Sequence, residues 1–527
     1  MPTLIAVVLL NDRFFVYEGM LLMVRASGIL MPLFSLPSKY GVGTLGREAY
    51  RFIDFLEKSG QTYWQMLPVG PTGFGDSPYQ SFSVCAGNPY FIDLDMLIEE
   101  KLLTKSEVEA VDWGGNSEVD YALLYKERFK LLDTAASRFL KKKSIEFDVF
   151  CRYHNWWLDD YAMFMAIKDS LSGCSFDCWE DGLKFRRENA MNDAKERLAA
   201  PIASYKVQQF FFHKQWKKLK KYAKSKGILL IGDIPIYTAF DSADVWGSPQ
   251  LFQLDEKLNP AAVAGVPPDA FSADGQLWGN PLYDWDYMKE DGYGWWIRRF
   301  KEAFTLFDYI RIDHFRAFSA YFSIPAQAET AAEGKWVKGP GEHFFEVLKQ
   351  SFGELPVIAE DLGILDDDVR SLLKYTGFPG MKVLQFAFDP EADSDYLPHN
   401  IGKNSVVYTG THDNDTAMGF CKDGDEEQVK FAREYLRIGE NDSFNWGLIK
   451  SAMATSAETV ILQMQDFLGL DNTARINIPS VKSGNWRWRI DYSCINDWLA
   501  KIIRDTTATY RRLPIKKETK PQLKKKK

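Results

Sequence analysis

Short apolar runs recur along this chain, separated by longer stretches that are charged or amphipathic. Four of them cover residues 27–33, 62–68, 227–237 and 381–388. Three more lead into a carboxylate: Tyr309-Ile-Arg-Ile-Asp313, Pro356-Val-Ile-Ala-Glu360 and Ser405-Val-Val-Tyr-Thr-Gly-Thr-His-Asp413. A continuous apolar run of this length is typical of a strand that is buried on both faces of a parallel sheet. The pattern therefore predicts a set of parallel strands, three of which present an acid at or beyond their carboxyl ends.

The spacing of the three acids predicts how these strands are arranged. Asp313, Glu360 and Asp413 follow one another at intervals of about 50 residues, which leaves room for one or two strand–helix units each time. In a barrel of parallel strands, the residues at the carboxyl ends face the active site. A single acid there could equally cap the next helix, but three together favour catalysis. We predict an α/β fold, a (β/α)8 TIM barrel with inserted, largely helical subdomains.

The pattern also predicts where the barrel is interrupted. From residue 93 to about residue 226 the sequence becomes charged and helix-like, which indicates a largely helical insertion. Residues 1–24 are expected to be a leader outside the main fold, and residues 25–510 one catalytic domain. Residues 511–527 form a basic tail that we expect to be disordered.

Composition narrows the function classes. The chain has 527 residues, 46% hydrophobic and 26% charged, as in ordinary globular proteins, and no stretch calls for a membrane span. A net charge of −8 makes nucleic acid a poor partner and suits a neutral substrate. Aromatic residues reach 15%, with 16 Trp, and aromatic rings pack against the apolar faces of sugars, although most belong to cores.

Cysteine usage points to a reducing compartment. Six cysteines are scattered along a long chain rather than clustered as in a small secreted domain, so we expect a cytoplasmic protein. Cys174 and Cys178 form a pair, but neither a histidine nor a second cysteine pair lies near enough in the sequence to complete a zinc site. We expect no metal site.

One early motif suggests a different function. Gly41-Val-Gly-Thr-Leu-Gly46 satisfies the dinucleotide-binding pattern and precedes a helical stretch. In a genuine dinucleotide-binding motif, the glycines follow a buried strand, and an acid lies about 20 residues later. Here the preceding residues 35–40 are loop-like, and no acid follows Gln65 until Asp76. A dehydrogenase would need a nicotinamide cofactor, and we expect neither that nor any other cofactor.

Several further motifs occur in one order along residues 25–497. They are Gly28-Ile-Leu-Met-Pro-Leu-Phe-Ser-Leu-Pro-Ser38, Gly75-Asp-Ser-Pro-Tyr-Gln-Ser-Phe-Ser83, Gly232-Asp-Ile-Pro-Ile-Tyr237, Gly265-Val-Pro-Pro-Asp269, Trp278-Gly-Asn-Pro-Leu-Tyr283 and Gly484-Asn-Trp-Arg-Trp-Arg489. Together with the acid segments, they resemble the 4-α-glucanotransferase family of amylomaltases and disproportionating enzymes. The resemblance implies an enzyme of carbohydrate metabolism that acts on α-1,4-glucans.

The resemblance assigns Asp313 as nucleophile, Glu360 as general acid and base, and Asp413 as the acid that stabilises the transition state. Such a retaining double displacement needs one ionised and one protonated carboxyl, about 5 to 5.5 Å apart. We therefore expect Glu360 to have a higher pKa than Asp313. Arg311, on the same strand face as Asp313, should keep the nucleophile ionised.

The resemblance also implies a set of glucan contacts. His412 is expected to bind sugar hydroxyls, Tyr79 to stack on the sugar ring, and Asp233 to shape the pocket. The long segment 254–280 resembles the lid of the family, and a long loop at a barrel rim is more often functional than a plain connector. The remaining expected contacts are Asp269, Phe271, Gln276, Trp278, Phe74, Ser77, His314, Asp389 and Asn485.

The expected partners are an α-1,4-glucan donor and a glucose or maltooligosaccharide acceptor. Transfer and hydrolysis share one intermediate and differ in whether a sugar hydroxyl or water attacks it. A retaining α-glucan hydrolase and a non-catalytic glucan-binding protein therefore remain alternatives. Oligomeric state cannot be read from one chain.

Overall fold

The computed structural model describes residues 23–514 apart from residues 74, 269–273, 364, 440 and 482. Almost all of the expected leader and residues 515–527 of the expected tail thus lie outside the described residues. Phe74, Asp269 and Phe271, three of the expected contacts, also lie outside them.

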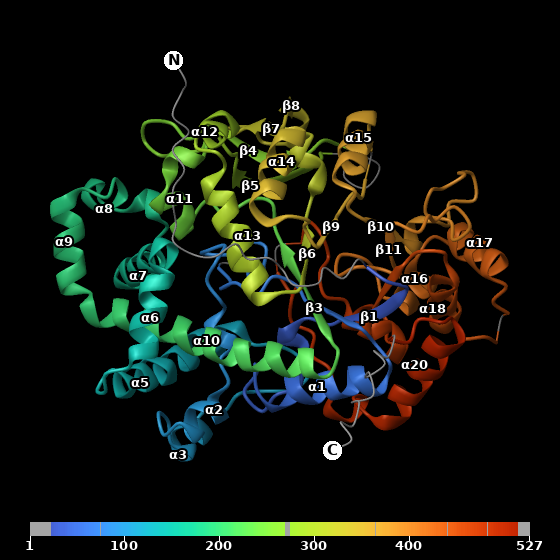
Figure 1. Ribbon diagram of the computed structural model, residues 1–527, viewed down its shortest axis with the longest axis horizontal. Helices are drawn as coiled ribbons and strands as arrows, with labels where there is room; N and C mark the ends of the chain where they lie inside the picture. Colours follow the sequence, from blue (N-terminus) through green and yellow to red (C-terminus); the bar gives the residue numbers. More distant parts are fainter. Residues whose placement is uncertain are drawn as a thin grey trace, which may run out of the picture.

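Eight parallel strands close into a barrel, as the sequence predicts (Figure 1). The strands are buried on both faces, which explains why they read as continuous apolar runs. Their order around the barrel is β1-β12-β11-β10-β9-β6-β3-β2. The bounds are β1 Ala26–Leu30, β2 Tyr63–Gln65, β3 Leu229–Ile234, β6 Tyr309–Ile312, β9 Val357–Ala359, β10 Gly380–Val383, β11 Ser405–Tyr408 and β12 Thr459–Gln463.

Helices flank the barrel strands and cover them by one apolar face each. In α1, Ala49, Phe52, Ile53 and Leu56 recur at helical spacing, and all four are buried. The other helices that alternate with or follow barrel strands are α13 Gly294–Leu306, α14 Gly341–Phe352, α15 Asp367–Thr376, α16 Ala417–Asp423, α17 Glu426–Leu436, α18 Phe444–Ala454, α19 Met464–Leu468 and α20 Asp497–Thr509; α1 itself spans Arg47–Lys58.

The segment between β2 and β3 is helical over most of its length, and Figure 1 shows it extending from one side of the barrel. Its longest member, α10, packs against α5, α6, α7 and α9 of the same segment and also against α1 and β3. The helices are α2 Leu94–Glu99, α3 Lys105–Glu109, α4 Tyr121–Leu123, α5 Phe129–Phe139, α6 Ile145–Tyr153, α7 Asn155–Ser170, α8 Asp181–Lys184, α9 Glu188–Arg197 and α10 Ala199–Ser225. Within the described ranges, none of the helices is both long and apolar enough to cross a bilayer.

A second sheet interrupts the chain after β3, and the sequence analysis did not foresee it. Its antiparallel order is β5-β4-β7-β8, with β4 Ala262–Val266, β5 Gln276–Pro281, β7 Ala320–Pro325 and β8 Lys335–Lys338. The expected lid, residues 254–280, is thus not a plain loop, because both β4 and most of β5 fall inside it. Helices α11 Ala243–Gly247 and α12 Trp285–Glu290 flank these strands in sequence.

Two further details correct the sequence analysis. The run Thr459-Val-Ile-Leu-Gln463 is the barrel strand β12, which was not recognised because no acid marks its end.

The tail boundary at residue 511 is wrong for Arg512. The Arg512 side chain is fully buried and donates hydrogen bonds to the carbonyls of Ala26 and Glu458, where β1 meets β12. A buried guanidinium needs such acceptors.

Candidate active site

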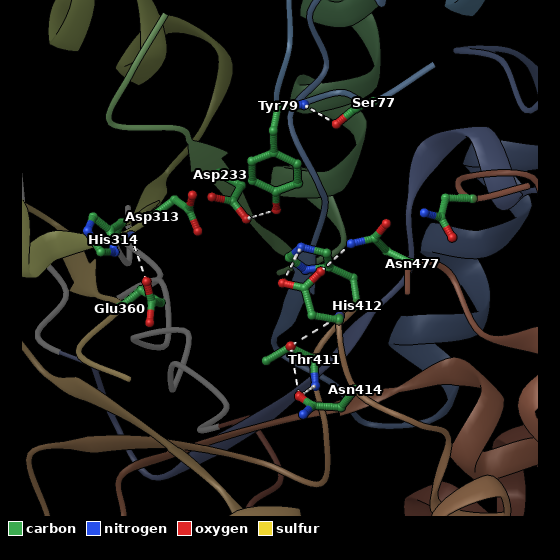
Figure 2. Close-up of polar contacts among 12 residues, drawn as sticks. Ser77, Tyr79, Asp233, Asp313, His314, Glu360, Thr411, His412, Asn414 and Asn477 are labelled. Atoms are coloured by element: carbon green, nitrogen blue, oxygen red, sulfur yellow. Dashed lines mark hydrogen bonds and ion pairs between the residues drawn. The ribbon is translucent and has the colours of Figure 1, made fainter. Parts of the chain in front are cut away.

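The three acids meet at one rim of the barrel because each follows a barrel strand. Asp313 directly follows β6, Glu360 directly follows β9, and Asp413 lies on the loop after β11. Figure 2 shows Tyr79 and His412 on one side of Asp313, and His314 and Glu360 on the other.

Arg311 connects two carboxylates on the strand side of this space. Its Nη1 donates to both carboxylate oxygens of Asp233 at 2.8 Å and lies 2.9 Å from Oδ1 of Asp313. The Tyr79 hydroxyl donates to Oδ2 of Asp233 at 2.9 Å (Figure 2). Arg311 and Asp233 are buried, so their charges are held by each other rather than by water. This arrangement fixes the nucleophile candidate against a cation, as expected for two residues on one strand face.

Both oxygens of Asp413 have hydrogen-bonding or charged neighbours. Oδ2 lies 3.2 Å from Nε2 of His412, and Oδ1 accepts a hydrogen bond of 2.6 Å from Nδ2 of Asn477 (Figure 2). The His412 ring stacks on Tyr79, with 5.1 Å between centroids and 15° between planes. Burial lowers the pKa of His412, while Asp413 opposes the shift. A neutral His412 beside an oriented carboxylate can hydrogen-bond sugar hydroxyls.

Glu360 is held by the backbone rather than by a side chain. Its Oε2 accepts from the N–H of His314 at 2.6 Å, and its Oε1 accepts from the N–H of Leu362 at 2.9 Å. His314 adopts φ of +52°, an uncommon conformation for a residue with a side chain, and it aims this N–H at Glu360. Nε2 of His314 is buried and finds no hydrogen-bond partner within the described part of the chain.

Burial raises the pKa values of both Asp313 and Glu360. The pKa of Asp313 rises to about 8; Asp233, Glu360 and Asp413 add to the rise, and Arg311 opposes it. The rise in the pKa of Glu360 is opposed by Arg311 and by the two N–H donors. N–H donors favour a carboxylate, and neighbouring carboxylates favour a carboxylic acid. The expected order of the two pKa values stays a prediction.

The lid side of the site is joined to Glu360 through His314. Trp278 on β5 meets the His314 ring edge-on, with 4.8 Å between centroids, and its Nε1 donates to Oε1 of Gln276 at 3.1 Å. Two expected contacts, Gln276 and Trp278, therefore belong to the same cluster as His314. Neither lies in an unstructured loop, because both are on a paired strand.

The other expected contacts are less directly connected. Ser77 accepts a hydrogen bond of 3.3 Å from the N–H of Tyr79 and so lies behind that ring. Asp389 is exposed and accepts from the N–H of Glu391. Asn485 bonds to the backbone of residues 478 and 481. Within the described part of the chain, neither Asp389 nor Asn485 hydrogen-bonds to one of the three acids.

Sequence reasoning missed the residues that orient Asp413. Asn477 donates to its carboxylate, and Arg475 donates to its carbonyl and pairs with Asp415. The N–H of Asn477 also donates to the His412 carbonyl at 3.1 Å. Thr411 and Asn414 hold the turn that carries Asp413. More than 60 positions separate Asp413 from Asn477, so no local spacing could signal the contact.

The early glycine motif has a structural explanation. A Cβ atom at Gly46, the residue before α1, would lie 1.9 Å from Oδ2 of Asp93. A carboxylate that accepts from Thr44 therefore already occupies the space at this helix start, where a phosphate would have to bind. Among the residues that the structure describes, no group of three or more His, Cys, Asp and Glu side chains is arranged to hold a metal ion.

Comparison with known proteins decides the family. The family model described as 4-alpha-glucanotransferase matches residues 31–494. The chain belongs to the 4-alpha-glucanotransferase family. A 4-alpha-glucanotransferase of Clostridium butyricum is 48% identical over 92% of this chain and 100% of that protein, and one of Thermus thermophilus is 47% identical over 88% and 95%.

Structural similarity agrees with the sequence. An amylomaltase from Streptococcus agalactiae, solved in complex with acarbose, superposes with a TM-score of 0.91 at 42% identity, over 93% of this chain and 100% of that one. The predicted family, the barrel fold and the 4-alpha-glucanotransferase function are confirmed. The chain is an enzyme of this transferase family, whereas the roles of its individual residues are inferred below from geometry.

Proposed function

We propose that the enzyme cleaves an α-1,4 bond in a maltooligosaccharide or in a glucan derived from starch or glycogen. It transfers the glucanosyl unit to the 4-hydroxyl of an acceptor glucan or of glucose. We place it in the cytoplasm, where its scattered free cysteines would stay reduced. The donor sugar occupies the space beside Tyr79 and His412, and the leaving sugar occupies the space beside Glu360 and His314.

The reaction is a retaining double displacement. Asp313 attacks the anomeric carbon while Glu360 gives its proton to the leaving oxygen, which frees the first product and leaves a glucanosyl ester on Asp313. Glu360, now a carboxylate, takes the proton of the acceptor 4-hydroxyl, and that oxygen displaces Asp313. Asp413 stabilises the positive charge that develops on the sugar ring in both steps.

The contact that carries this assignment is the bridge from Arg311 to Asp233 and Asp313. A cation 2.9 Å from the Asp313 carboxylate favours its ionised form, which is the form that attacks. Asp233 orients the cation, and the Tyr79 hydroxyl orients Asp233. A shift of Tyr79, Asp233 or Arg311 would therefore disturb the position of Asp313.

Glu360 has to carry the proton when glucan is bound. Two N–H donors fix the carboxyl group, so one of its oxygens can hold a proton toward the leaving oxygen while the other keeps its backbone contact. We infer that, when glucan is bound, Glu360 holds the proton and Asp313 is ionised beside Arg311. The positive charge that develops on the sugar ring stabilises the attacking Asp313 carboxylate, and the Glu360 proton passes to the leaving oxygen.

The glucan contacts follow from the same geometry. Tyr79, Asp233, Arg311 and His412 surround the sugar that is attacked. His314, with its unpaired buried Nε2, together with Gln276 and Trp278, borders the leaving and acceptor sugars. Asp269, Phe271, Phe74, Ser77, Asp389 and Asn485 remain proposed outer contacts. The acarbose complex of the Streptococcus agalactiae relative supports ligand binding at a site of this type.

Incubation of the purified enzyme with maltotriose alone tests the proposal. Transfer predicts free glucose together with a growing ladder of longer maltooligosaccharides. Glucose and maltose without longer products would instead make the enzyme a hydrolase on this substrate. Unchanged maltotriose in the presence of folded protein would overturn the proposed reaction.

A further inference from the structure

Trp336 is a large aromatic residue that the mechanism above does not use. It lies on β8, an edge strand of the antiparallel sheet, between the exposed Lys335 and the half-buried Val337. It is 41% exposed although it belongs to a sheet whose interior is apolar. A partly exposed indole ring offers an apolar face on which a sugar ring can stack.

The ring of Trp336 is fixed by its neighbours. The guanidinium of Arg316 lies 3.8 Å from the ring centroid, and Phe322 meets the ring edge-on at 5.1 Å. Arg316 in turn pairs with Asp366 at 3.2 Å. A flat ring held on one face and at one edge has little freedom left to lose when a ligand covers the rest.

Contacts through Arg316 and Asp366 link the Trp336 ring to the two segments that follow Asp313 and Glu360. Arg316 is three residues after Asp313, in the 3-10 helix Phe315–Phe318. Asp366 lies six residues after Glu360 and caps α15. Figure 1 places β8 and α15 at the same end of the molecule, and the Arg316 contacts join them.

The position favours the side of the leaving and acceptor sugars. Figure 2 shows His314 and Glu360 on the opposite side of Asp313 from Tyr79 and His412. Arg316 lies two residues after His314 in the sequence, and its guanidinium packs on the ring of Trp336. Trp278 contacts His314, and Trp336 contacts Arg316, so two indoles border one short segment.

We propose that Trp336 forms an outer acceptor subsite, on which a glucose unit of a bound α-1,4-glucan stacks by its apolar face. The unit stacked there lies beyond the one whose 4-hydroxyl reacts, so glucose alone is too short to reach it. Arg316 and Asp366 are positioning residues for this ring. The inference rests on the proposed function, because it names how that same site selects acceptor length.

A donor with fluoride as leaving group isolates the acceptor step. Maltosyl fluoride places no leaving sugar in the acceptor space, so kcat/KM can be measured for glucose and for maltotetraose separately. In the native enzyme we expect maltotetraose to be the better acceptor. In Trp336→Ala and Trp336→Leu, the preference for maltotetraose over glucose should fall about fivefold, the loss expected for one stacking contact. The Leu side chain in Trp336→Leu can still pack on Phe322, so this variant separates loss of the stacking contact from loss of the folded sheet.

Trp498, exposed on α20, supplies the matched control, and Trp498→Ala should keep the native preference. An unchanged length preference in both Trp336 variants would overturn the subsite. So would an equal fall in kcat/KM for glucose and maltotetraose, because that would place the effect on the reacting centre. Failure of the native enzyme to release fluoride and form any transfer product would instead contradict the proposed function.

Discussion

The two sides of the active site are built differently. On the strand side, Arg311 and Asp233 lie on barrel strands and hold Asp313 through contacts between buried side chains. On the loop side, Glu360 is held by backbone N–H groups, and Trp278 reaches it through His314 from a separate sheet. A side that binds the attacked sugar has to be rigid, whereas a side that exchanges one sugar for another has to admit and release chains. The difference in construction fits the donor and acceptor positions that we propose for the two sides.

Replacing Asp313, the proposed nucleophile, should have the largest effect. Asp313→Asn removes the attacking oxygen charge and should lower kcat by about 10^4-fold or more, while glucan binding persists because the strand side remains assembled. Turnover of maltosyl fluoride and calorimetric binding of maltotetraose measure the two quantities. Retained turnover would show that another residue is the nucleophile. Loss of both turnover and binding would show that the main role of Asp313 is to maintain the structure of the pocket.

The second largest effect should come from Asn477, which extends the strand side through the Asp413 loop. Asn477→Ala removes a hydrogen bond to a charged group, worth about 1.5–3 kcal/mol, and should lower kcat by roughly 10- to 100-fold with a smaller change in KM. Asn477→Asp should be worse, since it adds a like charge. Asn404→Ala, an exposed change, is the control. Equal activity of the Ala and Asp variants would contradict this positioning role.

A smaller effect should come from opening the loop side. Trp278→Ala removes the ring that borders His314 and should raise the ratio of hydrolysis to transfer several-fold, because water gains access to the intermediate. The ratio of hydrolysis to transfer is calculated from the number of new reducing ends formed per glucose released. An unchanged ratio together with reduced total activity would indicate that Trp278 binds glucan without excluding water.

The smallest change should be a shift of the pH profile. Burial raises the pKa of Asp313, and kcat/KM rises with pH as the free enzyme loses that proton. Asp233→Asn removes one carboxylate that raises this pKa and leaves Arg311 to Asp313, so the acid limb should move to lower pH. Asp505→Asn, on the surface, should leave the limb in place. A shift of the limb to higher pH would contradict the electrostatic account.

The sequence revealed the strand side far better than the loop side. Parallel barrel strands are buried on both faces, so the short runs before Asp313 and Asp233, apolar apart from Arg311, can be recognised without knowing which strands pair with them. The strand β8, Lys-Trp-Val-Lys, has no such run, and its pairing with β7 depends on residues that only the fold brings near. Asn477 meets Asp413 for the same reason. The two N–H donors to Glu360 also escaped prediction, because backbone hydrogen bonds leave no mark in a sequence.

The covalent intermediate tests the central claim most directly. In Glu360→Gln, maltosyl fluoride can still glycosylate the enzyme, because fluoride needs no acid to leave, whereas the base that activates an acceptor is missing. The account predicts that peptide mass spectrometry after acid quenching finds a maltosyl ester on Asp313. An ester on another residue, or the absence of an ester while fluoride is released, would contradict the assignment of Asp313 as nucleophile.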